Sequence, residues 1–193
     1  EPYRRQRQMC IRDRNLYYFA GKDVWKTLFD LEAMRPGMVL LSAQAPDGDP
    51  AWCDVVTLMT PVATRPWKAW EGSAPGRRPE AYTALKAAMT QATVDFACAR
   101  LPELRDAIAH TYAATPLTYR HYTGAPHGAA YGLLKDWRSI MASHIPARTK
   151  FDNLLLTGQN LTVHGAIGVT LSAAATCSEI VGTEYLAKKI ANA

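Results

Sequence analysis

The residues best suited to chemistry stand near the end of the chain. An apolar run, Asn153–Thr157, is followed at once by Gly158 and Gln159, and a few positions later by His164-Gly-Ala-Ile-Gly168. From Val169 to about Ile190 the composition is helical. A strand, a glycine turn and a helix that begins at glycines form a place suited to anions, because the first N–H groups of a helix lack internal partners and its dipole is positive there.

Small side chains keep the first turns of this helix thin. Gly168 is followed by Ser172, Ala173, Ala174, Ala175 and Thr176, which allows close packing against a sheet or a flat cofactor. An apolar stripe accompanies them at helical spacing: Ile167, Leu171, Ala174, Ser178, Val181 and Tyr185. A plain strand–turn–helix with a small-residue packing face explains the same pattern, so both interpretations stay open at this point.

Other common catalytic motifs are missing from the chain. It has no G-x-G-x-x-G, no G-x-x-x-x-G-K-[ST], no H-E-x-x-H and no G-x-S-x-G. The five histidines never stand four residues apart, so the sequence predicts no metal site. The four cysteines form no C-x-x-C pair, which favours free thiols and a reducing, cytoplasmic compartment.

The net charge of +5 is concentrated in the first 14 residues. That segment holds five arginines and two acidic residues, so the rest of the chain is nearly neutral. A basic tail on a nearly neutral body argues against a nucleic-acid partner. The stretch 6–14 is similar to translated adapter sequence, and we expect residues 1–14 to be disordered or artefactual.

Short elements precede the C-terminal motif. The pattern predicts strands at Asn15–Ala20, Met38–Ala43 and Asp54–Thr60, the last two as an antiparallel pair joined by the turn Ala45–Pro50. Asp23 is expected to cap a short helix that runs through Leu31.

An amphipathic helix is predicted over Glu80–Arg100. Tyr82, Leu85, Met89, Ala92 and Phe96 share one face, which favours a helix that covers a sheet. Before it, residues 61–79 should form a proline-rich loop whose Trp67 and Trp70 pack onto the body. After it, a short helix should run from Pro102 through Ile108.

A second glycine-rich stretch follows an expected extended segment, Tyr112–Thr118. Glycines at 124, 128 and 132 either let the backbone approach something closely or form a mobile loop. The sequence leaves these two alternatives even.

The C-terminal motif resembles the flavin-contact motif of the phytoene desaturase-like flavoproteins, a group that includes carotenoid desaturases, carotenoid isomerases and retinol saturases. The matching residues are Asn153-Leu-Leu-Leu-Thr-Gly-Gln159, His164-Gly-Ala-Ile-Gly168 and the small-residue helix. Thr115-Pro-Leu-Thr118 and Gly128-Ala-Ala-Tyr-Gly132 resemble the substrate-domain sequence of the group.

This resemblance implies an FAD site with two separated halves. An N-terminal G-x-G-x-x-G turn would hold the pyrophosphate, and that half is absent from these residues. The C-terminal half would meet the ribityl chain near Gly158 and Gln159, although many members carry Asp where Gln159 stands. The flavin ring would meet the backbone of Gly165, Ala166, Ile167 and Gly168, with His164 beside it.

The resemblance also implies a fold and an organisation. The predicted class is α+β, with a mixed, largely antiparallel substrate-domain sheet and a covering helix, plus the C-terminal strand–turn–helix of an FAD-binding Rossmann-like domain. Residues 15–147 would form the substrate-domain portion and residues 148–193 the C-terminal part of the FAD-binding domain. The chain would be a C-terminal fragment, inactive by itself.

The implied function is that of an FAD-dependent oxidoreductase that moves a hydride between flavin and a C–C bond of a lipophilic polyene. The resemblance names no catalytic side chain. The expected partner is a lipophilic small molecule, with no nucleic acid, in the cytoplasm and with peripheral membrane contact left open. The alternative is a non-enzymatic lipid- or protein-binding α+β module.

Overall fold

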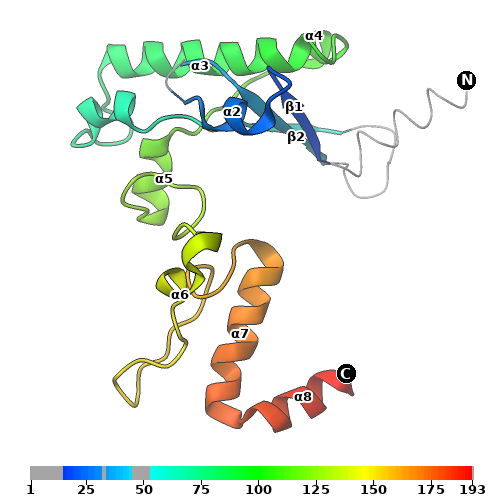
Figure 1. Ribbon diagram of the computed structural model, residues 1–193. Helices are drawn as coiled ribbons and strands as arrows, with labels where there is room; N and C mark the ends of the chain where they lie inside the picture. Colours follow the sequence, from blue (N-terminus) through cyan, green and yellow to red (C-terminus); the bar gives the residue numbers. More distant parts are fainter. Residues whose placement is uncertain (1–14, 32–33, 45–52, 193) are drawn as a thin grey trace, which may run out of the picture. The chain divides into compact units, whose positions relative to one another are not determined.

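The computed structural model describes residues 15–31, 34–44 and 53–192 (Figure 1). The chain divides into two compact units, Glu1–His121 and Tyr122–Ala193. The two are described separately below. The boundary expected at residue 148, between a substrate domain and an FAD-binding domain, stays a prediction.

The first unit is built on a three-stranded antiparallel sheet in the order β1-β2-β3. The strands are β1 (Leu16–Phe19), β2 (Met38–Gln44) and β3 (Val55–Met59). On β2, alternate residues face the core: Val39, Leu41 and Ala43 are all buried. All three predicted strands are confirmed, whereas the predicted turn at 45–50 lies outside the described residues.

Helix α2 (Val24–Phe29) begins where the sequence predicted a cap. The Asp23 side chain accepts a hydrogen bond from the Lys26 backbone N–H at 3.0 Å, which satisfies one of the unpaired donors of the first turn. The helix ends two residues earlier than expected.

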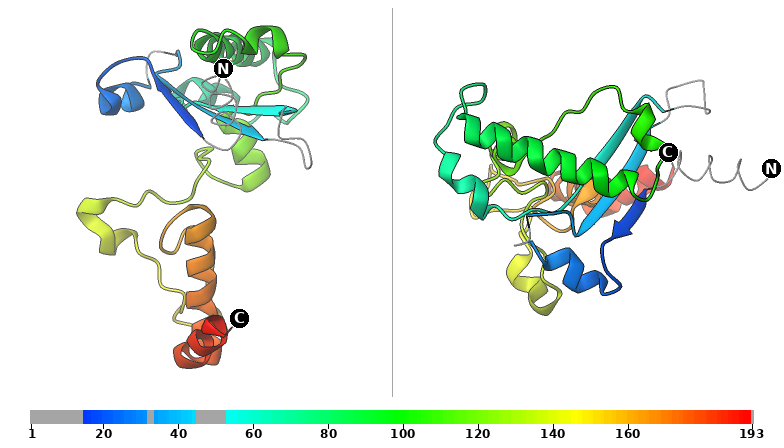
Figure 2. Two further views of the ribbon diagram at one scale, coloured as in Figure 1. Left: turned by 90° about the vertical axis from the view of Figure 1, so that its right-hand side faces the viewer. Right: turned by 90° about the horizontal axis from the view of Figure 1, so that it is seen from above.

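Helix α3 (Glu80–Cys98) contacts β2 and β3, as its apolar face predicted (Figure 2). Tyr82 at its start packs with Trp67 and Leu117 in a buried cluster. Trp67 belongs to the 3-10 helix η1 (Arg65–Trp70), and this tryptophan is only 2 % exposed. The expected packing of the proline-rich segment onto the body is therefore confirmed, although its helical turns were not predicted.

The expectation of an extended Tyr112–Thr118 is wrong in its second half. After α4 (Leu104–Ala107), the chain forms α5 (Pro116–Thr123), which begins at the proline itself. Proline is favoured in the first turn of a helix because its missing N–H would be unpaired there and its φ is already helical. Thr115 assists this start, because its backbone N–H donates to Thr118 Oγ1 at 3.1 Å.

The second unit holds η2 (Trp137–Ser139), α6 (Ile140–Ser143), α7 (Gly165–Val181) and α8 (Thr183–Ala191). The single helix expected to about Ile190 is in fact two, which meet at an angle (Figure 1). Gly182 separates them with a φ of +87°, a value that L side chains rarely adopt.

The buried strand expected at Asn153–Thr157 is also corrected. Leu155 forms one isolated antiparallel bridge with Arg148, while Leu154 and Leu156 are 47 % and 38 % exposed. An apolar run becomes a buried strand only where neighbouring strands supply ladder hydrogen bonds and cover both faces, and the described residues supply no such neighbours to this segment.

The predicted α+β class is confirmed by the mixture of helices with a small antiparallel sheet. Among the described residues, no helix is both long enough and apolar enough to cross a membrane.

Candidate functional site

The start of α7 has no side-chain cap. His164 occupies the N-cap position with extended backbone, but its side chain makes no capping hydrogen bond, and the first turn carries no acidic residue. The N–H groups of this turn therefore point out of a 17-residue helix whose dipole makes this end positive. Such an end attracts an anionic or electron-rich group.

Three of the predicted site residues are open to solvent at this end. Gly165 and Ala166 are exposed, and Ile167 is 78 % exposed. Gly165 has a φ of +79° and an open space where a Cβ would stand. Gly165 therefore leaves its backbone uncovered at the start of the turn, and Ala166 adds only a methyl group.

Gly168, in contrast, is buried and lies where the helix packs on the preceding loop. A Cβ at this position would stand 2.1 Å from the Val163 carbonyl oxygen, far inside van der Waals contact. The close approach that the sequence indicated at Gly168 is therefore an approach to the chain's own backbone. Its predicted contact with a flavin stays a prediction.

The same face continues along the helix with small polar residues. Ser172 is fully buried and its Oγ lies 3.2 Å from Thr162 Oγ1. One turn later, Thr176 Oγ1 donates to the Leu156 carbonyl at 2.7 Å. The small-residue face therefore packs on residues 156–163, which leaves much of the apolar stripe outside.

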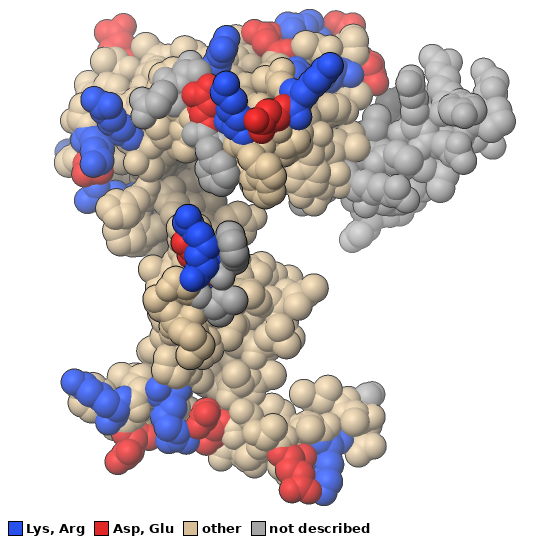
Figure 3. All heavy atoms as spheres, viewed as in Figure 1, with Lys and Arg blue, Asp and Glu red and all other residues tan. Residues whose placement is uncertain are grey.

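The large apolar residues of that stripe remain exposed on α7, whereas Ala174 and Ser178 are half-buried. Ile167, Leu171 and Val181 are 78 %, 55 % and 47 % exposed. On the face shown in Figure 3, the surface over most of α7 carries few charges. Tyr185 of the stripe falls on α8, beyond the break at Gly182, and so leaves the common face.

Gly158 and Gln159 begin the turn that leads to this helix. Both are half-buried, and Gly158 has a φ of +108°. Leu161 closes the turn, because its N–H donates to the Gly158 carbonyl at 3.3 Å. The structure thus places all seven predicted residues in one continuous loop and helix start, running from 158 to 168.

His164 contributes an unpaired buried atom to the site. Its Nδ1 is buried without a hydrogen-bond partner, and its ring centroid lies 5.9 Å from that of Tyr131. Tyr131 comes from the second glycine-rich stretch, where the next residue is Gly132. A Cβ on Gly132 would collide with Asn160 Oδ1, so at this position the structure favours the interpretation that the backbone approaches another segment closely.

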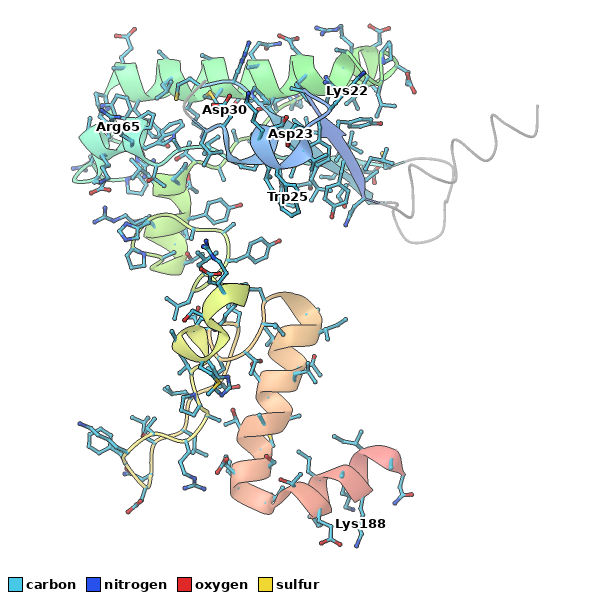
Figure 4. All side chains as sticks on the ribbon, viewed as in Figure 1. Lys22, Asp23, Trp25, Asp30, Arg65 and Lys188 are labelled. Carbon is cyan, nitrogen blue, oxygen red and sulfur yellow. The ribbon has the colours of Figure 1, made fainter. Side chains whose placement is uncertain are left out.

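The first unit offers a separate cavity of about 710 Å³. It lies between the β1–α2 connection and α3, with Ala92 and Phe96 on its lining. Lys22, Asp23 and Asp30, which Figure 4 labels, also line it. None of the predicted site residues belongs to this cavity.

Comparison with known proteins identifies the class to which the chain is similar. The matched relatives are reductases, so the similarity is to oxidoreductases. They carry the name all-trans-retinol 13,14-reductase: the human protein is 29 % identical over 143 residues and the rat protein 30 % identical over the same length. A zebrafish relative named as an inactive all-trans-retinol 13,14-reductase is 28 % identical over 115 residues.

The chain is similar to retinol 13,14-reductases, which confirms the retinol saturase-like resemblance expected from the sequence. The human and rat alignments include 69 % of this chain but only 23 % of each relative, so the match spans about a quarter of their length. The zebrafish alignment includes 58 % of this chain and 19 % of the relative. No protein-family model and no solved structure matches the chain.

Proposed function

We propose that this chain supplies the flavin-ring side of the cofactor site of an FAD-dependent oxidoreductase acting on a C–C bond of a lipophilic polyene. The similarity to retinol 13,14-reductases supports the reaction class. The observation that carries the flavin part is the uncapped start of α7, where Gly165 and Ala166 are exposed with little side chain to cover their backbone, next to the unpaired Nδ1 of His164.

These residues fit a flavin. Backbone N–H groups at the positive end of a helix stabilise negative charge on the pyrimidine side of a reduced flavin ring. Gly165 and Ala166 carry no side chain large enough to hold a flat ring away from them. Gly158 and Gln159, at the start of the same loop, would face the ribityl chain, where the Gln159 amide offers both a donor and an acceptor without adding charge.

When bound, a flavin supplies the hydride donor or acceptor for saturating or forming a carbon–carbon double bond. The chain's own contribution is to bind the ring, to fix its orientation and to exclude water. The exposed apolar residues near the site, Ile167 and Leu171, suit a lipophilic substrate that lies against the ring. Such a substrate also favours peripheral contact with a membrane.

In this proposal the helix α7 belongs to a Rossmann-like FAD-binding domain. Its adenosine half would need a G-x-G-x-x-G turn, which these 193 residues do not contain. We therefore expect weak flavin binding and no turnover from this chain by itself. The alternative of a non-enzymatic module is not favoured, because the matched relatives are named as reductases.

A pair of matched variants tests the flavin contact. Ile167→Glu places a carboxylate in the first turn of α7, whereas Leu171→Glu places the same group one turn further on. Both positions are exposed, and a carboxylate at a helix N-terminus stabilises the helix, so neither change should unfold the unit. We expect Ile167→Glu to weaken binding of FMN about tenfold, because the carboxylate offsets the positive end of the helix and repels the electron-rich pyrimidine carbonyls and the phosphate of FMN. Leu171→Glu should change the affinity less than about twofold.

The measurement is a titration followed by quenching of FMN fluorescence. ADP, which resembles the adenosine half of FAD, is the control ligand and should compete poorly. Equal affinities in the two variants would refute the flavin contact at this turn.

A further inference from the structure

Lys135 is held by three main-chain carbonyl groups. Its Nζ donates to the carbonyl of Ser143, to that of Asn160 at 2.6 Å and to that of Leu161 at 3.1 Å. An ammonium group has three donors, and all three are used here. The side chain is half-buried, and among the described residues no carboxylate pairs with it.

Asn160 is fixed a second time through its side chain. Its Oδ1 accepts a hydrogen bond from the Leu133 N–H at 2.9 Å, and the absence of a side chain on Gly132 makes room for this contact. The next residue, Leu161, also accepts from the Ile145 N–H at 3.1 Å and is 4 % exposed. The turn that leads to α7 is therefore tied at adjacent residues to two other segments.

The segment around Lys135 reaches the other end of the same loop. Tyr131, four residues earlier, contacts the ring of His164 at the N-cap of α7. Residues 131–135 thus contact the loop at Asn160, at Leu161 and at His164. The contacts lie within the second unit and span 25 or more positions of sequence, so they set where the loop stands rather than its local conformation.

We propose that Lys135 is a positioning residue for the flavin contact, acting through the carbonyls of Asn160 and Leu161. Its charge orients these two carbonyls toward itself, and the loop from Gly158 to His164 is held where the first turn of α7 can meet the ring. Charge-assisted hydrogen bonds are about twice as strong as neutral ones, which suits one side chain to this task. This inference rests on the function proposed above.

The test compares Lys135→Met with Lys150→Met in the full chain. Methionine keeps most of the side-chain length but removes the three donors, and Lys150 is an exposed lysine of the same unit whose Nζ lies over the Phe151 ring. Amide hydrogen exchange at residues 158–164 reports the hold on the loop. FMN fluorescence quenching reports the flavin contact, at a temperature where circular dichroism shows that each variant is folded.

We expect Lys135→Met to speed exchange in the loop and to weaken FMN binding, each by about tenfold, with Lys150→Met unchanged. Asn160→Ala, which removes the Leu133 contact but keeps the carbonyl that Lys135 bonds, should give a smaller effect of the same kind. This second variant keeps the test decisive if Lys135→Met does not fold.

Three other outcomes overturn the proposal. Unchanged exchange in the loop would show that the ammonium does not hold it. Faster exchange with unchanged FMN affinity would make Lys135 structural only. If the unaltered chain fails to bind FMN, the proposed function itself fails, and the exchange data then show separately whether Lys135 holds the loop.

Discussion

Replacement of Gly168 by alanine should destabilise the packing of α7, although alanine is the better helix former. The added Cβ would stand 2.1 Å from the carbonyl oxygen of Val163 and 2.5 Å from the carbonyl carbon of the same residue. Both are backbone atoms, which cannot rotate aside as the end of a side chain can.

The magnitude follows from two opposing terms. Overpacking of this kind costs about 3 kcal/mol at the upper end of its usual range. Alanine gains about 1 kcal/mol over glycine inside a helix. We therefore expect Gly168→Ala to lower the free energy of unfolding of the second unit by about 2 kcal/mol.

Ala175→Gly calibrates the helix term in the same element. Ala175 is exposed on α7, so its replacement should cost about 1 kcal/mol from helix propensity alone. The assay is urea-dependent hydrogen exchange of α7 amides, which reports this unit separately. If Gly168→Ala were as stable as the unaltered chain or more so, the Val163 carbonyl would not lie against the helix.

Two further predictions concern the first unit. Tyr82→Phe removes a buried hydroxyl that lies 2.8 Å from Thr115 Oγ1, and should lower the free energy of unfolding in urea by about 1–2 kcal/mol. The control Tyr112→Phe changes an exposed residue and should lower it hardly at all. Equal losses of unfolding free energy in the two variants would contradict this. The pKa of Asp95 lies below its ordinary 3.8 because the Arg105 side chain donates to it at 2.9 Å. The Asp95–Arg105 pair therefore stabilises the fold above pH 3.8, and this contribution is lost as the pH falls through the lower pKa of Asp95 in the folded chain. An NMR titration of the Asp95 carboxyl carbon measures that pKa. A titration midpoint at the ordinary value would refute the pairing.

Elements with local causes could be predicted from the sequence. The apolar spacing from Tyr82 to Phe96 determines α3, because a helix needs only its own hydrogen bonds and one surface to cover. The Asp23 cap was predictable for the same reason, since donor and acceptor are three residues apart. The loop and helix start from 158 to 168 could be predicted as one candidate site because its residues are continuous in sequence, and its flavin contact stays a prediction.

Features that depend on distant partners could not be predicted. The run Leu154–Leu156 has the composition of a buried strand, yet a strand needs neighbours, which the described residues do not give it. The role of Gly168 depends on where Val163 stands, and that is a matter of tertiary packing. Lys135 gives no sequence signal at all, because its carbonyl partners lie 8 to 26 residues away.

The most direct test of the flavin proposal is an NMR titration of the isotopically labelled chain with FMN. Even weak binding moves backbone amide resonances, so the method does not depend on the missing G-x-G-x-x-G half. The account predicts concentration-dependent shifts concentrated at residues 158–168 and around Tyr131, with ADP producing none there. No shifts with FMN, or shifts concentrated in the first unit, would contradict the assignment of this loop and helix start as a flavin contact.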